Sequence, residues 1–97
     1  MLIGAMSIEN VDSISRAQCR GARGLLDLTQ PKLAAASGLG LSTIVDFERA
    51  RRSVSKEAIA MIRAALERGG IEFIDENGGG PGVRLKKSTK GKGRKEG

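Results

Sequence analysis

The sequence predicts a mainly α-helical fold of four to five short helices, followed by a C-terminal β-hairpin and a disordered basic tail. Three observations lead to this prediction. Apolar residues recur at helical spacing between positions 14 and 70. Capping and helix-breaking residues divide that stretch into short segments. After Gly70, the pattern changes to two β-prone runs that flank a glycine-rich turn.

The first helix is expected to begin after Ser15. Ser15 and Gln18 have the spacing of a capping box, in which the serine hydroxyl accepts from the Gln18 backbone N–H and the glutamine side chain reaches back. Cys19, Ala22 and Leu26 follow at i, i+3 and i+7, so they form an inward apolar face. We interpret Cys19 as a core residue rather than as a reactive thiol.

Two shorter helices are expected next, over residues 30–37 and 41–49. Thr29 is the N-cap of the first of them, and Pro31 lies in its first turn, where a missing N–H breaks no intrahelical bond. Gly38 is expected to end that helix in a left-handed conformation, which glycine adopts at little cost.

A fourth helix is expected to start after Ser55, with Glu57 in its first turn to complement the helix dipole. Gly69 and Gly70 end it. Five residues at helical spacing form its apolar stripe: Ala58, Ile59, Ile62, Ala65 and Leu66.

Residues 71–74 and 83–85 are expected to pair as a hairpin. The glycine-rich run 78–82 between them lacks the Lys-Ser/Thr pair of a phosphate-binding loop, so we interpret it as the hairpin turn. A two-stranded hairpin is marginal on its own in water, so this one is expected to pack on the helices or to pair with a second subunit.

Four regions follow from this pattern. They are a flexible arm (1–13), a helical domain (14–70), a hairpin extension (71–87) and a disordered basic tail (88–97).

The net charge is +6 and is unevenly distributed along the 97 residues. The last twelve positions contribute +5, from six Lys or Arg and one Glu, and this tail is either a DNA-tethering arm or a solubilising end. Positions 16–56 carry eight basic and three acidic residues, also +5, so the remaining positions are acidic. A basic half on a nearly neutral body is typical of a surface that faces phosphates, although a solvated helical surface has the same pattern.

The composition argues against an enzyme. The chain has no histidine and a single cysteine, which removes Cys–His and Ser–His nucleophile pairs and most metal sites. We therefore expect no catalysis, no cofactor and no metal. The single cysteine fits a reducing compartment, and no apolar run approaches the ~20 residues that span a bilayer, so a cytoplasmic protein without membrane contact is expected.

The spacing of small and branched residues between Thr29 and Glu48 indicates a helix-turn-helix. Ala34 lets two helices cross closely, Gly38 makes the sharp turn, and Ile44 locks the next helix in place. This arrangement holds the helix at 41–49 out from the surface, where it can enter a major groove.

The stretch from about residue 15 to 68 resembles the Cro/phage-repressor (xenobiotic-response-element) family of helix-turn-helix transcriptional regulators. The residues that carry the resemblance are Thr29-Gln30, Leu33-Ala34, Gly38, Thr43-Ile44 and Phe47-Glu48-Arg49. The hairpin that follows looks like an extension found on small members of this family.

The resemblance implies three groups of site residues. Base-reading positions are Leu41, Ser42, Thr43, Val45 and Asp46. Phosphate-contacting positions are Gln30, Lys32, Arg49, Arg51 and Arg52. Arg23 and Glu48 fall where some members form an ion pair between the first and third helices, although they can also be independent surface charges. None of the reading positions has the bidentate Arg, Gln or Asn that specific readers often use, so modest sequence discrimination is expected.

Three functions fit these features. The first is a homodimeric transcriptional regulator, expected to act as a repressor on duplex DNA, with residues 59, 62, 66 and 71–74 as candidate dimer surfaces. The second is the antitoxin of a toxin–antitoxin pair, which would bind a protein toxin as well as its operator. The third is a protein-interaction module that has lost DNA binding.

Overall fold

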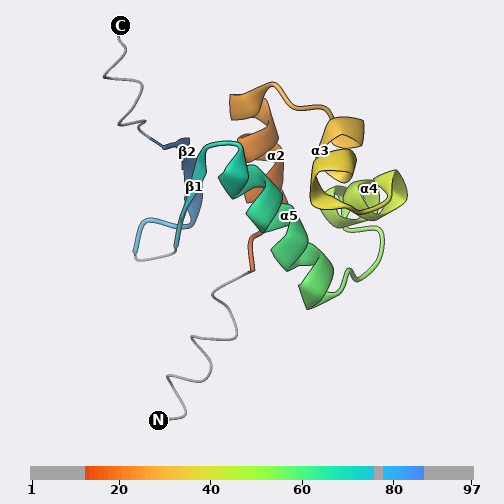
Figure 1. Ribbon diagram of the computed structural model, residues 1–97. Coiled ribbons are helices and arrows are strands. Elements are labelled where there is room, and N and C mark those ends of the chain that lie inside the picture. The colour runs from red at the N-terminus through yellow and green to blue at the C-terminus, as the bar shows by residue number, and fades with distance from the viewer. Residues whose placement is uncertain (1–12, 76–77, 87–97) are drawn as a thin grey trace, which may run out of the picture.

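The computed structural model describes residues 13–75 and 78–86, and within them four helices precede a two-stranded antiparallel hairpin (Figure 1). The helices and strands are α2 (Arg16–Leu26), α3 (Gln30–Ser37), α4 (Leu41–Arg49), α5 (Lys56–Arg68), β1 (Ile71–Ile74) and β2 (Gly82–Leu85). The predicted mainly α-helical fold with a C-terminal hairpin is confirmed. The expectations of a flexible arm and a disordered tail concern positions 1–12 and 87–97, which lie outside the described residues.

The helix starts agree with the capping residues in the sequence. Ser15 and Gln18 form both bonds of the capping box, at 3.0 and 2.8 Å. The hydroxyls of Thr29 and Ser55 each accept from a backbone N–H three residues on, at 3.3 and 3.1 Å. Gly38 ends α3 with φ +78°, as its position in the sequence predicts.

Two other helix ends were not anticipated. Asp27 and Ala50 cap α2 and α4 in the left-handed conformation, with φ values of +56° and +54°. This conformation costs an L-residue roughly 1–2 kcal/mol, and Asp tolerates it better than Ala because its short polar side chain can bond locally. A backbone hydrogen bond next to Ala50 stabilises this strained conformation: the Arg51 N–H donates to the Asp46 carbonyl at 2.9 Å.

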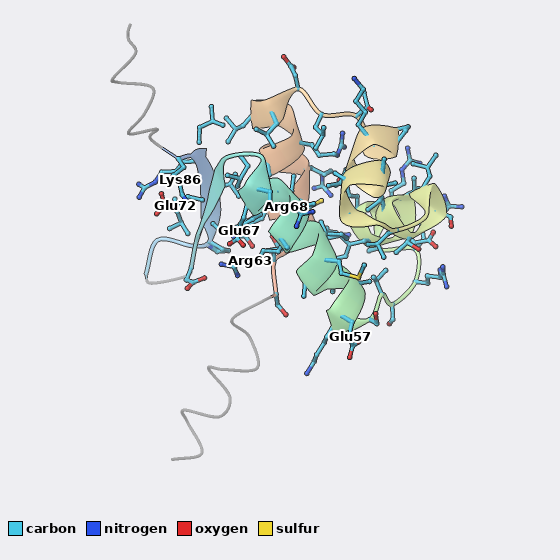
Figure 2. The ribbon with its side chains drawn as sticks, viewed as in Figure 1. Glu57, Arg63, Glu67, Arg68, Glu72 and Lys86 are labelled. Carbon is cyan, nitrogen blue, oxygen red and sulfur yellow. The ribbon has the colours of Figure 1, made fainter. Side chains whose placement is uncertain are left out.

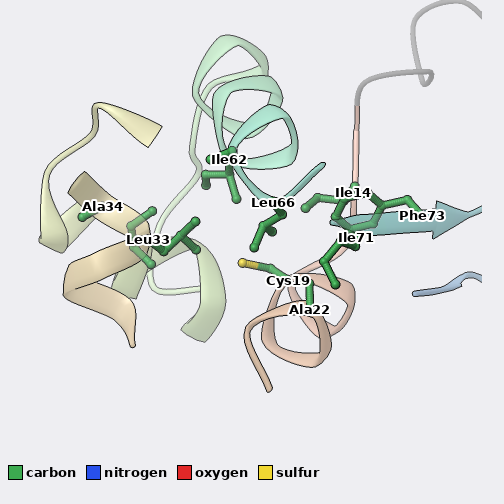
Figure 3. Close-up of a cluster of buried hydrophobic side chains, with 11 residues drawn as sticks. Ile14, Cys19, Ala22, Leu33, Ala34, Ile62, Leu66, Ile71 and Phe73 are labelled. Atoms are coloured by element: carbon green, nitrogen blue, oxygen red, sulfur yellow. The ribbon is translucent and has the colours of Figure 1, made fainter. Parts of the chain in front are cut away.

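One apolar core joins the helices to the hairpin (Figure 3). Leu33 and Ile44 come from α3 and α4, Ile62 and Leu66 from α5, and all four are fully buried. Ile71 of β1 belongs to the same cluster, so the hairpin packs on the helices of its own chain.

The hairpin is fastened to α2 as well. The Gln18 side-chain amide donates to the carbonyl of Gly82 at 3.0 Å and, more weakly, to that of Ile74 at 3.5 Å. A Cβ at Gly21 would lie 3.3 Å from the Val83 side chain, so a residue without a side chain suits this contact. Gln18 therefore both closes the capping box and positions the hairpin.

Most of the residues that were expected to form a dimer surface are buried in this core. Ile62, Leu66 and Ile71 are 0 to 1% exposed, and Phe73 is buried beside them. Ile59 and Ile74 are half-buried. The buried residues of this stripe pack inside the core of their own chain, where α5 contacts α2 and α3 as well as β1, so they present no surface to a second copy.

Candidate nucleic-acid interface

The α3–turn–α4 unit has the geometry of a helix-turn-helix. The turn is closed by backbone bonds from Gly38 and Leu39 to the Ala34 carbonyl, at 3.0 and 3.1 Å. Gly40 then starts α4 without a side-chain cap. Figure 1 shows α3 and α4 together on one side of α5, away from the hairpin. The interface candidate is therefore a separate face of the molecule.

Glu48 is the polar centre that fixes α4 against the other helices. It is 2% exposed, yet its carboxylate accepts from four donors. Arg23 binds it in a bidentate manner, with Nε 2.7 Å from Oε2 and Nη2 2.8 Å from Oε1. The Gln30 amide donates to Oε1 at 3.0 Å, and the Cys19 thiol donates to Oε2 at 3.0 Å. One side chain thus ties α4 to both α2 and α3.

These bonds decide the charge state of the centre. Burial alone raises the pKa of Glu48, but the bonds from Arg23, Cys19 and Gln30, together with the charge of Arg23, outweigh burial and lower it. The Glu48 bond raises the pKa of Arg23. Burial, followed by the bond and the negative charge of Glu48, raises the pKa of Cys19. The centre therefore holds a carboxylate, a guanidinium and a neutral thiol.

Two arginines of α2 also bond to backbone carbonyls. Arg20 Nη1 donates to the Glu48 carbonyl at the end of α4, at 2.8 Å, and Arg23 Nη1 donates to the Leu28 carbonyl at 3.0 Å. Cations near a helix C-terminus complement its dipole. Arg20 therefore anchors the end of α4 to α2.

Arg23 and Glu48, the ion pair that the family resemblance implies, lie together in the structure. The roles of Arg20 and Cys19 were not predicted. The sequence does place Cys19 and Arg23 four residues apart, on adjoining turns of α2, which was the available signal.

The outward face of α4 carries two of the five candidate base-reading residues, Ser42 and Asp46, and the phosphate candidate Arg49. Ser42, Asp46 and Arg49 follow at i, i+4 and i+7, opposite the buried Ile44 and Glu48. Ser42 and Arg49 are exposed.

The other three candidates lie on the flanks of this face. Leu41 is 45% exposed and shares one flank with half-buried Val45. Thr43 is on the opposite flank, where it lines a hollow together with Val54 and Ala58. The geometry therefore turns Thr43 toward the loop before α5 and leaves the other four candidates on or beside the outward face.

Asp46 is covered although it points outward. Arg52 Nε donates to its Oδ2, and Arg51 Nε lies 3.8 Å from its Oδ1. The Asp46 side chain is 14% exposed, whereas those of Arg51 and Arg52 are 60% and 63% exposed. A residue expected to read bases and two expected to bind phosphates are thus paired with one another.

Of the remaining phosphate candidates, two are exposed cations and one is a half-buried amide. Lys32 and Arg49 are exposed, and within the described part of the chain neither forms an ion pair. Gln30 is half-buried, and its amide nitrogen already donates to Glu48, which leaves one further N–H on the same nitrogen. The bond to Glu48 orients that amide at the start of α3.

No protein-family model and no curated protein sequence matches this chain. Within the described residues, no helix is both long and apolar enough to cross a membrane.

Proposed function

We propose that this protein binds duplex DNA by inserting α4 into the major groove, and that it acts as a homodimeric transcriptional regulator of the repressor type. The observation that carries the proposal is the Glu48 centre. A buried carboxylate with four donors fixes the orientation of α4 while Ser42 and Arg49 remain on its outward side. Buried ion pairs contribute little net stability, and their best-attested use is to specify one arrangement of packed elements.

The charges around α4 support a nucleic-acid partner. Four exposed arginines lie at or near the C-terminal end of α4. Arg49 ends the helix, Arg51 and Arg52 follow it in the loop, and Arg16 of α2 lines a hollow beside Ala50 and Arg52. Arginine binds phosphate through a planar fork of donors and stays charged at any physiological pH. Contacts to phosphate supply most of the affinity, and Ser42, Leu41 and Val45 supply a weaker reading of bases.

A dimer would place two α4 helices about 34 Å apart on a palindromic site, one helical turn of DNA from centre to centre. Occlusion of the promoter would then explain repression. Because Ile62, Leu66 and Ile71 are buried within the chain, a surface other than these residues would have to hold the two copies together.

Selection from a random duplex library at ~150 mM salt tests the proposal, with salt held constant because phosphate-driven affinity depends steeply on it. We expect an enriched palindrome. Arg49→Gln should weaken binding, whereas Lys86→Gln, which removes the same charge at the hairpin, should have a smaller effect. Binding without enrichment would reject specific regulation. Absence of binding would reject a DNA function and favour an interaction module, in which exposed Leu41 and half-buried Val45 would contact a protein.

A further inference from the structure

The feature that the proposed function leaves unexplained is the pairing of Asp46 with Arg51 and Arg52. Asp46 lies on the outward face of α4 between Ser42 and Arg49, where a bare carboxylate would repel DNA phosphates. The two arginines cover it from the loop that begins at Ala50. In the free protein, the three side chains together carry a charge of +1 instead of the +2 that the arginines alone would present.

We propose that Asp46 controls the specificity of DNA binding by competing with phosphates for Arg51 and Arg52. This inference rests on the proposed function. On arbitrary duplex, a phosphate competes with the Asp46 carboxylate for the two arginines, and an arginine that turns away to a phosphate weakens the pairing of that carboxylate. Burying an unpaired carboxylate against a groove is costly, so pairing with Asp46 opposes non-specific binding.

Asp46 no longer competes with the phosphates where the DNA supplies a hydrogen-bond donor to its carboxylate. In the major groove, the cytosine N4 amino group is such a donor, whereas guanine O6 and N7 and thymine O4 are acceptors that repel a carboxylate. Adenine presents a donor beside the N7 acceptor, so it is a poorer partner. When Asp46 accepts from cytosine, Arg51 and Arg52 can turn to the phosphates without leaving an unpaired charge. Phosphate contact and base identity are thereby coupled.

The local geometry allows this exchange. The backbone of the loop is fixed, because the Arg51 N–H donates to the Asp46 carbonyl at 2.9 Å, while the arginine side chains are more than half exposed. Exposed ion pairs contribute about 0–1 kcal/mol, so the pairs can open at little cost once a replacement donor is present. Only side chains need to move.

The test compares Asp46→Asn with the wild type and with Glu67→Gln. Glu67 pairs with Arg63 at 2.9 Å on α5, and Figure 2 shows both near the hairpin end of that helix, so Glu67→Gln makes the same change of charge away from α4. Dissociation constants for random duplex are measured over a range of salt. We expect Asp46→Asn to steepen the slope of log K against log salt by about one and to strengthen random binding roughly tenfold at ~50 mM salt, since each extra neutralised phosphate contributes about 0.9 to the slope.

A second readout is the selected sequence. The wild type should enrich cytosine at one position in each half-site, and Asp46→Asn should lose that preference. In an Arg51→Gln/Arg52→Gln background, adding Asp46→Asn should no longer steepen the slope. The inference is overturned if Asp46→Asn matches Glu67→Gln, if it weakens random binding, or if its effect persists without the two arginines. A wild type that binds no duplex overturns the proposed function itself, whereas a wild type that binds with an unchanged Asp46→Asn slope overturns this inference alone.

Discussion

Replacing Arg23 with methionine tests the Glu48 centre most directly. The change removes two of the four donors to a carboxylate that is 2% exposed, and leaves Gln30 and Cys19 as the others. Breaking a buried pair by deleting one partner typically costs 3–5 kcal/mol, because the other charge stays buried without compensation. The Arg23 side chain is 21% exposed, and two neutral donors remain, so we expect about 3 kcal/mol, the low end of that range.

Such a loss is large for a domain of this size, whose whole stability is about 5–10 kcal/mol. The free energy of unfolding is measured from urea denaturation followed by far-UV circular dichroism at neutral pH. The paired variant Arg23→Met/Glu48→Met is the control. It removes both charges, so it should recover most of the lost stability while leaving α4 without its polar anchor.

A cost below about 1 kcal/mol for Arg23→Met would contradict this prediction, since it would mean that the Glu48 carboxylate is satisfied without its arginine. A double variant no more stable than the single one would refute it too. In that case, the damage would come from lost packing of the arginine stem and not from an uncompensated carboxylate.

Three further predictions concern single groups. The pKa of Glu48 is lowered in the native state, so the stability that it contributes is present above its ordinary value and is lost as pH falls through the native pKa. Urea midpoints should therefore decline below about pH 5, and more steeply for the wild type than for Glu48→Gln. Burial and the bond to Glu48 raise the pKa of Cys19, so a thiol reagent should label it only at the rate of unfolding, and rapid labelling of the native protein would contradict the buried position. Ala50→Gly should raise the urea midpoint by the equivalent of about 0.5–1 kcal/mol, because glycine adopts the left-handed conformation at φ +54° without strain. The greater entropy of glycine in the unfolded chain offsets part of this stabilisation. A lower midpoint would show that the strain is absent.

Local chemistry explains why much of this fold could be predicted from the sequence. Ser15, Thr29 and Ser55 cap helices through bonds to residues three positions away, and Gly38 is left-handed because the chain must turn there. These interactions span a few residues, so their spacing in the sequence predicts them. In the candidate site, the pairing of Arg23 with Glu48 was predicted from the family resemblance alone. Local spacing could not predict it, because the two residues are 25 positions apart.

The remaining features depend on tertiary structure. The hairpin packs on α2 through the Gln18 side chain and the close approach of Val83 to Gly21, and the sequence pattern at these two residues does not predict either contact. The pairing of Asp46 with Arg51 and Arg52 requires the left-handed turn at Ala50, a conformation that alanine rarely adopts. Cys19 was correctly placed in the core, but its bond to Glu48 depends on how closely α2 and α4 approach.

If α4 is the recognition helix of the proposed function, the four donors around Glu48 also limit how the protein can adapt to different DNA sequences. Because both carboxylate oxygens accept bonds from two neighbouring helices, a rotation or shift of α4 within the domain would break these bonds. A recognition helix held in this way would require the duplex, and not the protein, to change shape in the complex. Sites of equal base content would then be ranked by how easily their flexible pyrimidine–purine steps bend toward the protein, and spacer sequences that the protein never touches would alter affinity.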